Sequence, residues 1–152
     1  MKDFENDLIY YPNPDPVKEP RFILNSVDEL ENLNEKEKGV LPVIALTGKE
    51  PRDGYGYEFR GFINIPKDDV YLLYVESDDG SRMYIDGNQI ADNDKQHATI
   101  EKSGQAALKK GFHPIRVLFF QKSGGANLKA SIRPATGNKK EITEDMLYHS
   151  EK

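Results

Sequence analysis

The stretch VYLLYVESDDGSRMYIDG, Val70–Gly87, decides the fold that the rest of the chain has to accommodate. Its first half is dense in Tyr, Leu and Val, residues that suit a pleated, half-buried strand. Asp79-Gly80 then interrupts the apolar run, and such a pair tolerates the positive φ angles of a two-residue hairpin turn. Arg82–Ile85 alternates again before Asp86-Gly87 supplies a second turn. The stretch therefore predicts two strands joined by a tight acidic turn.

The segments on either side of this stretch carry further strand patterns. Tyr57–Ile65 alternates between apolar and polar residues, and His113–Gln121 is apolar on both faces for most of its length. Leu128–Arg133 alternates once more, and weaker strands are expected at Ala98–Lys102 and Gln105–Leu108. Several short strands with turn signals every eight to twelve residues or so predict an all-β, antiparallel β-sandwich or barrel.

One short N-terminal helix is expected within Ser26–Gly39. Ser26 and Glu29 have the spacing of a capping box, in which each side chain satisfies a backbone donor of the other residue. Val27, Leu30 and Leu33 follow at three-residue spacing, which gives a narrow apolar stripe along one helix face.

The chain of 152 residues suits one domain with leading and trailing segments. Residues 1–20 contain four of the nine prolines and predict an extended leading arm or linker. We assign residues 21–149 to the β-sandwich and residues 150–152 to a tail.

Composition excludes several classes of function. The net charge of −5 is spread over mixed signs and argues against binding nucleic acid through phosphate neutralisation. No window approaches the run of about 18 apolar residues that a membrane span requires. The chain has no cysteine, which excludes a disulfide framework, thiol catalysis and cysteine-ligated zinc. Its first residues contain no apolar targeting core, so we expect a mature fragment or an excised domain, the alternative being a cytosolic protein.

A series of motifs runs in order along the chain: YEFRGFINIP (57–66), VYLLYVESDDGS (70–81), MYIDG (83–87), DND (92–94), His97, LKKGFHPIR (108–116), Gly124-Gly125 before Leu128, and MLYH (146–149). Together they resemble the PA14 domain, a β-sandwich module of jelly-roll type that occurs in bacterial toxins, glycosidases, proteases and yeast adhesins. The resemblance covers about residues 33–149. The opening strand usual in the family is not recognisable in Phe4–Leu24.

The resemblance implies a carbohydrate-binding or adhesion module, usually attached to a larger secreted or cell-surface protein. In the sugar-binding adhesin branch, two successive Asp residues joined by a cis peptide hold a calcium ion, which in turn coordinates sugar hydroxyls. Asp78-Asp79 occupy the matching place here. Other branches carry the same pair without a demonstrated ligand.

Asp78 and Asp79 therefore have two interpretations. Adjacent carboxylates supply hard oxygen ligands for calcium, which takes six to eight of them, so Asn127, backbone carbonyls and sugar hydroxyls would have to complete the shell. The alternative is that Asp79 serves the turn and Asp78 accepts a hydrogen bond from a nearby backbone donor.

Other candidate site residues lie nearby in the sequence. Asp92, Asp94 and Gln96 are spaced like the opening of a calcium loop but lack its glycine and distal Glu, so a solvated turn is the alternative. We expect Asp92 to assist as a metal ligand. Tyr55, between two glycines, is the best candidate for an exposed ring that stacks on a sugar, whereas a tyrosine can equally serve packing. The three histidines are too dispersed for a metal-ligand spacing.

The expected function is therefore that of a non-catalytic, calcium-assisted carbohydrate-binding module. Adjacent carboxylates in one turn are poorly placed for glycoside hydrolysis, which needs two carboxyl groups about 5–9.5 Å apart on opposite sides of the bond. The expected partners are a glycan and a neighbouring catalytic domain of the same chain, in an extracellular, cell-surface or periplasmic setting. The alternative is a structural module that packs against an attached enzyme.

Overall fold

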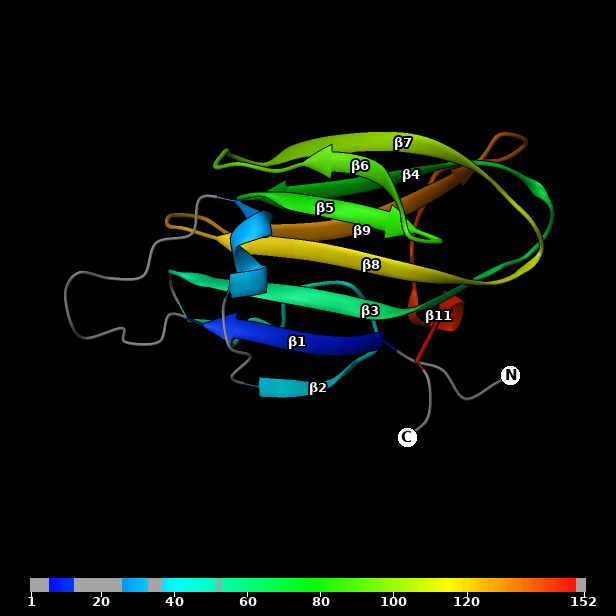
Figure 1. Ribbon diagram of the computed structural model, residues 1–152. Coiled ribbons are helices and arrows are strands. Elements are labelled where there is room, and N and C mark those ends of the chain that lie inside the picture. Colours follow the sequence, from blue (N-terminus) through cyan, green and yellow to red (C-terminus); the bar gives the residue numbers. More distant parts are fainter. Residues whose placement is uncertain (1–5, 13–25, 33–36, 52, 150–152) are drawn as a thin grey trace.

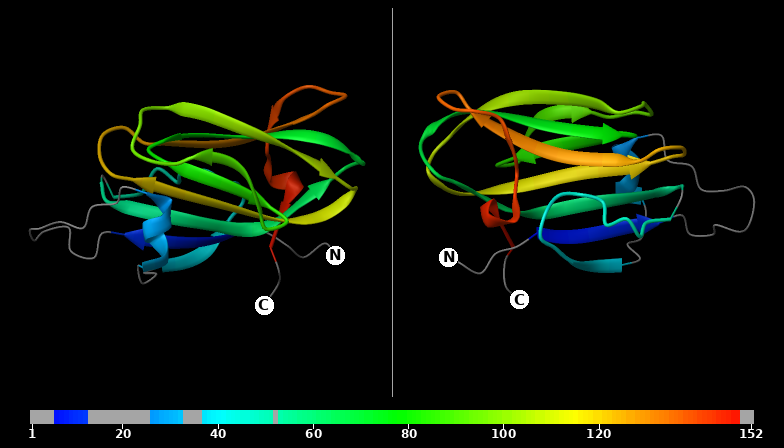
Figure 2. Two further views of the ribbon diagram at one scale, coloured as in Figure 1. Left: turned by 45° about the horizontal axis from the view of Figure 1, so that its top comes forward. Right: turned by 180° about the vertical axis from the view of Figure 1, so that it is seen from behind.

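Two antiparallel sheets pack face to face in the computed structural model, which describes residues 6–12, 26–32, 37–51 and 53–149 (Figure 1). The larger sheet has the order β2-β1-β3-β8-β5-β6, with β11 paired to β3, and the smaller sheet has the order β10-β9-β4-β7. Figure 2 shows the smaller sheet from behind. The strands are β1 (Asn6–Pro12), β2 (Glu37–Leu41), β3 (Tyr55–Ile65), β4 (Asp69–Asp78), β5 (Ser81–Ile85), β6 (Asn88–Asn93), β7 (Ile100–Leu108), β8 (Gly111–Gln121), β9 (Asn127–Pro134), β10 (Lys140–Glu141) and β11 (Leu147–Tyr148). This architecture confirms the predicted all-β sandwich.

The main core lies between the sheets and is filled by the alternating apolar residues of the central strands. Strand β4 shows the pattern most clearly, because Tyr71, Leu73 and Val75 are at most 1% exposed, while the residues that alternate with them are half-buried or, at Val70, exposed. Residues at every second position of a strand point to the same face, so this alternation directs one face of β4 into the core. The opposing sheet contributes Phe59 and Phe119, which are also fully buried.

The helical segment near the N-terminus is shorter than expected and of a different type. Residues Val27–Asn32 form a 3₁₀ helix, η1, whereas Glu37–Leu41 at the far end of the predicted helix forms strand β2. Val27 and Leu30 pack with Leu118 and Phe120 in a small second cluster on the outer face of the larger sheet. The three-residue spacing predicts a continuous helix, but only the short segment η1, which packs on that sheet, is helical. A second 3₁₀ turn, η2 (Glu144–Met146), lies near the C-terminal end.

The predicted leading arm is wrong for residues 6–12. These residues form β1, which pairs with β2 on one side and with β3 on the other. Strand β1 thus supplies the opening strand of the sandwich that is not recognisable in the sequence. The later prolines of the predicted arm, Pro14, Pro16 and Pro20, lie outside the described residues, as does the tail at residues 150–152.

The acidic turn at Asp78–Gly80 joins the two sheets, so the prediction of a hairpin at this point is wrong. Strand β4 belongs to the smaller sheet and β5 to the larger one, where β5 pairs with β6 and β8. The reason is that β8 offers a long apolar partner to β5, while β4 is flanked by β7 and β9. The Asp78–Gly80 turn therefore bridges the two layers at one end of the sandwich.

The edges of the two sheets also meet along β6 and β7. The two weaker strands predicted at 98–102 and 105–108 are a single strand, β7, and Gly104 at its centre lies against the carbonyl of Ile90 in β6. Within the described residues, no helix has the length and apolar character that crossing a membrane would require.

Candidate functional site

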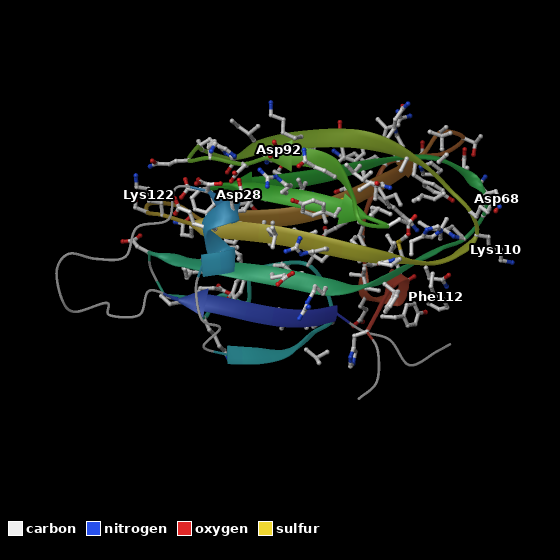
Figure 3. The ribbon with its side chains drawn as sticks, in the orientation of Figure 1. Asp28, Asp68, Asp92, Lys110, Phe112 and Lys122 are labelled. Carbon is white, nitrogen blue, oxygen red and sulfur yellow. The ribbon has the colours of Figure 1, made fainter. Side chains whose placement is uncertain are left out.

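The turn formed by Asp78, Asp79 and Gly80 lies at the left end of the sandwich in Figure 1, where three connections meet. Beside it are the β6–β7 loop (94–99) and the β8–β9 loop (122–126), and Figure 3 shows Lys122 at this end. The peptide bond between Asp78 and Asp79 is cis. The turn thus lies at one end of the sandwich between two other connections, and its role as a ligand site stays a prediction.

Asp79 is buried and held by backbone groups. Asp79 is 2% exposed, and its carboxylate Oδ2 accepts a hydrogen bond of 2.8 Å from the backbone N–H of Lys122 in the β8–β9 loop. Its carbonyl accepts a second bond of 2.8 Å from the hydroxyl of Ser77. Asp79 thus belongs to the turn, as expected, and its carboxylate also connects the β4–β5 turn to the β8–β9 loop.

A floor of buried polar side chains supports this turn from inside the sandwich. The hydroxyls of Ser77 and Ser81 lie 2.6 Å apart, and the amide Nδ2 of Asn93 donates to the Ser77 hydroxyl at 3.2 Å. All three residues are at most 2% exposed. Because buried polar groups are costly unless they are paired, these bonds allow the end of the core to be polar beneath the acidic turn.

Gly80 is required by close packing rather than by its backbone angles. Neither Asp79 nor Gly80 has a positive φ angle, and the hairpin prediction depends on such angles. A Cβ atom at position 80 would instead lie 2.4 Å from the Phe120 ring and 2.7 Å from the carbonyl oxygen of Lys95. The chain can turn here only because residue 80 has no side chain.

Asp78 is half-buried, and its carboxylate is destabilised in the charged form. Its pKa is raised above the ordinary value first by burial and then by the neighbouring Asp79 carboxylate, while nearby His97 acts in the opposite direction. A Cβ atom placed on Gly125 would lie 3.6 Å from Asp78 Oδ2, so the β8–β9 loop lies directly beside this oxygen. Two carboxylates held close together, with one partly desolvated, form an arrangement that a cation or several hydroxyl donors would stabilise.

Asn127 is positioned next to the pair, as expected. It is the strand partner of Asp78 in the register of β4 and β9. Its side-chain Nδ2 donates to Glu76 Oε2 at 2.9 Å, which fixes the orientation of the amide. Asp78, Asp79 and Asn127 therefore come together at one end of the sandwich.

Asp92 does not join them as a third acidic ligand. Its carboxylate binds Arg82 Nε at 3.1 Å, and Arg82 also binds Asp28 and Asp94. In the part of the chain that the structure describes, no three acidic or histidine side chains gather in a way that could hold a metal ion. The structure pairs Asp92 with Arg82 rather than with the Asp pair, and its role as a metal ligand stays a prediction.

Tyr55 is not an exposed platform for a sugar. Its side chain is 1% exposed and packs edge-on against Tyr57, with ring centroids 5.6 Å apart, and against Phe119. Of the two flanking glycines, Gly56 lies within β3 and against Leu30 of η1, whereas Gly54 forms a bend with positive φ just before the strand. The packing interpretation holds for this tyrosine.

The histidines have structural contacts. His97 has its ring nitrogens 2.6 Å and 2.7 Å from the carbonyl oxygens of Ala98 and Asn93, which fixes the β6–β7 loop. His113 lies 2.9 Å from the carboxylate of Asp86 and 2.7 Å from the carbonyl of Lys109.

Sequence reasoning did not identify the support from Ser77, Asn93 and the Lys122 N–H, because serine and asparagine spacing or a backbone donor gives no local signal.

Comparison with known proteins identifies the same fold around this site. The model of the PA14 domain family matches residues 42–146. The anti-sigma-I factor RsgI3 of Acetivibrio thermocellus is 27% identical over 101 residues, which are 66% of this chain and 16% of that protein. The chain therefore spans a small part of its curated relative.

Two solved structures have similar folds at low sequence identity. An anti-sigma factor domain-containing protein from Clostridium clariflavum superimposes with a TM-score of 0.76 and 21% identity, over 98% of this chain and 48% of that one. A PA14 sugar-binding domain from an RTX adhesin superimposes with a TM-score of 0.74 and 16% identity, over 97% of this chain and 99% of that one. With the family model matching more than half of its length, this chain belongs to the PA14 domain family.

Proposed function

We propose that this domain binds carbohydrate without catalysing a reaction, at the end of the sandwich formed by Asp78, Asp79 and Asn127. The observation that supports the proposal best is the partly buried carboxylate pair, which the β8–β9 loop holds through the bond from the Lys122 N–H to Asp79. Carboxylate and amide oxygens accept hydrogen bonds from sugar hydroxyls. The similarity in fold to a sugar-binding adhesin domain is consistent with this role.

We further propose that calcium assists this binding. The donor set fits the ion in chemical type, because Asp78 and Asp79 supply carboxylate oxygens and Asn127 an amide oxygen, and calcium prefers oxygen ligands. Three side chains do not complete a shell of six to eight oxygens, so backbone carbonyls and ligand hydroxyls would supply the others. When bound, the ion would supply positive charge to polarise and orient hydroxyl groups.

The test is thermal unfolding in excess calcium and then in EDTA, repeated with Asp79→Asn. A ligand present at about 100 times its dissociation constant adds about 2.7 kcal/mol to the free energy of unfolding, which raises the midpoint by several degrees. We expect this rise in the wild type and its loss in Asp79→Asn, followed by glycan-array binding that depends on calcium. An unchanged midpoint together with an array without signal would refute carbohydrate binding, whereas glycan binding in EDTA would refute only the calcium.

The alternative of a signal-recognition or interaction module is favoured by the two anti-sigma-factor relatives. In this role the domain would bind its ligand outside the cell, at the surface or in the periplasm, and a segment attached to it would respond. The test uses the intact protein that carries the domain and measures sigma-factor-dependent transcription with and without added polysaccharide. A response that Asp79→Asn abolishes would support this role, and a response that is the same in the variant would exclude the Asp pair from it. The pairing with a neighbouring catalytic domain stays a prediction.

A further inference from the structure

The segment Ser26–Asn32, which contains η1 and which we call the strap, is fastened beside the site by a buried carboxylate. This carboxylate belongs to Asp94, the first residue of the β6–β7 loop, and its side chain is 4% exposed. It accepts hydrogen bonds from the Ser26 hydroxyl at 2.5 Å and from the Val27 N–H at 2.9 Å. Arg82 Nη2 lies 3.3 Å from the same carboxylate and pairs with it, although it is shared with Asp28 and Asp92. Asp94 therefore joins the strap to the loop.

The residues that follow Asp94 in the β6–β7 loop pack against the acidic turn. The backbone of Lys95 packs on Gly80 so closely that a Cβ atom there would lie 2.7 Å from the Lys95 carbonyl oxygen and 2.8 Å from its nitrogen. The next residue, Gln96, accepts a hydrogen bond of 3.2 Å from the Lys122 side chain on the opposite loop. A change in the position of Asp94 would thus be transmitted to Gly80 and to Lys122, the two residues that contact Asp79 from the turn and from the β8–β9 loop.

A second connection runs through the apolar side of the strap. Leu30 is 2% exposed and packs in the cluster with Val27, Leu118 and Phe120. The backbone N–H of Phe120 donates to the carbonyl of Gly80 at 3.0 Å, and the Phe120 ring occupies the space above Gly80. The polar connection and the apolar connection therefore converge on the same residue of the site.

We propose that Asp94 and Leu30 are positioning residues for the Asp78–Asp79 site, and that docking of the strap sets the geometry of this site through Gly80. Neither residue has to touch the ligand. Because coupling between two equilibria is reciprocal, a ligand bound at the site stabilises the docked strap by the same factor by which the docked strap strengthens binding. The ligand-dependent half of this inference rests on the proposed function, whereas the geometric half does not.

The experiment pairs two variants at the strap with two chemically matched variants at the opposite end of the sandwich. Asp94→Asn is matched by Asp86→Asn in the β5–β6 turn, and Leu30→Ala is matched by Leu147→Ala in β11, which lies at the right in Figure 1. Ser26→Ala is a milder third variant that removes one hydroxyl and keeps the Asp94 charge. All variants are measured well below their unfolding midpoints, so that the folded state dominates, and the matched variants show what a loss of stability alone does to hydrogen exchange.

The first measurement needs no ligand and records the backbone amide resonances of Gly80 and Lys122 by NMR. We expect Asp94→Asn, Leu30→Ala and Ser26→Ala to shift these two resonances in the same direction and to speed hydrogen exchange at the Val27 amide. The variants at the opposite end should leave all three amides unchanged. Faster exchange at Val27 with unchanged Gly80 and Lys122 resonances would overturn the proposal, because the strap would then be loosened without any effect on the site.

The second measurement uses calcium together with a glycan identified on the array. In the wild type, saturation should slow exchange at Val27, and Asp94→Asn should weaken binding by the same factor, on the order of 5- to 150-fold for coupling of ordinary size. Unchanged affinity in a variant whose Gly80 resonance has moved would overturn the coupling. If the wild type binds neither calcium nor glycan, the proposed function fails, and the first measurement still decides the positioning role.

Discussion

Gly104 provides a direct test of how the two sheets are closed along one edge. A Cβ atom at this position would lie 1.7 Å from the carbonyl oxygen of Ile90 and 2.8 Å from its carbonyl carbon. Ordinary contact begins at 3.4 Å, so Gly104→Ala requires β6 and β7 to separate by about 1.7 Å. Both atoms belong to the backbone, which cannot rotate away as a side chain can.

The expected cost follows from the behaviour of overpacked sites. Inserting a methyl group into a close-packed interior typically costs about 1–3 kcal/mol, and a backbone obstacle places this site at the upper end or above it. For a domain of this size, about 3 kcal/mol lowers the unfolding midpoint by roughly 6–12 °C. The assay is thermal unfolding followed by circular dichroism, with urea unfolding to obtain the free energy.

Gly39 in β2 is the matched control, because it also lies in a strand at the edge of a sheet. Among the described residues, and apart from its two chain neighbours, no atom lies within 4 Å of the position that the Cβ of residue 39 would occupy, and its φ is not positive. Gly39→Ala should leave the midpoint unchanged or raise it, since alanine restricts the unfolded chain more than glycine does. If Gly104→Ala unfolds at the same temperature as Gly39→Ala, the close contact between β6 and β7 does not exist.

Two further predictions concern His113 and Tyr55. Burial would lower the pKa of His113, but the Lys109 carbonyl and the Asp86 carboxylate outweigh it and raise the pKa. The resulting stabilisation is full below the unfolded pKa of about 6.5 and is lost as pH rises through the higher folded pKa, so His113→Asn should lower the urea midpoint more at about pH 5.5 than at about pH 9. Equal losses at both pH values would contradict this. Tyr55→Ala should cost about 3–5 kcal/mol as a large core truncation and leave the glycan affinity of the folded protein unchanged. A weaker affinity with unchanged stability would restore Tyr55 as a ligand contact.

Alternation of side chains predicts most of the strands but not their partners. Tyr57–Ile65 and His113–Gln121 read clearly as strands because they fill the core from one side or both. The Asp79-Gly80 pair, in contrast, has the local chemistry of a hairpin, and only the competition between β8 and β4 for β5 places it between two sheets. Strand β1 is not predicted for the same reason, because Pro12 and the prolines that follow it suggest an arm, while the pairing of β1 with β3 is a long-range event.

The candidate site divides in a similar way. The family resemblance identifies Asp78 and Asp79, and the number of oxygen ligands that calcium takes points to Asn127. The structure brings these three residues together. It gives no information about the Lys122 N–H, because a backbone donor has no signature in the side-chain sequence. Glycines on both sides of Tyr55 suggest an exposed loop, but a Cβ atom at Gly56 would lie 2.3 Å from a Leu30 methyl group, so this glycine makes room for the strap.

The order in which the chain visits its two sheets has a consequence for how the domain forms. Strand β3 belongs to the larger sheet, β4 to the smaller one and β5 to the larger one again, while β3 pairs along its whole length with the distant β8, from Tyr55 opposite Gln121 to Ile65 opposite Gly111. Neither layer can be completed before the β8–β9 part of the chain has been synthesised. Folds dominated by such distant pairings have high contact order and fold in milliseconds to seconds rather than microseconds. A shortened version that ends before β8 would leave both sheets with open edges, so the domain has to be synthesised as one complete unit before it can fold.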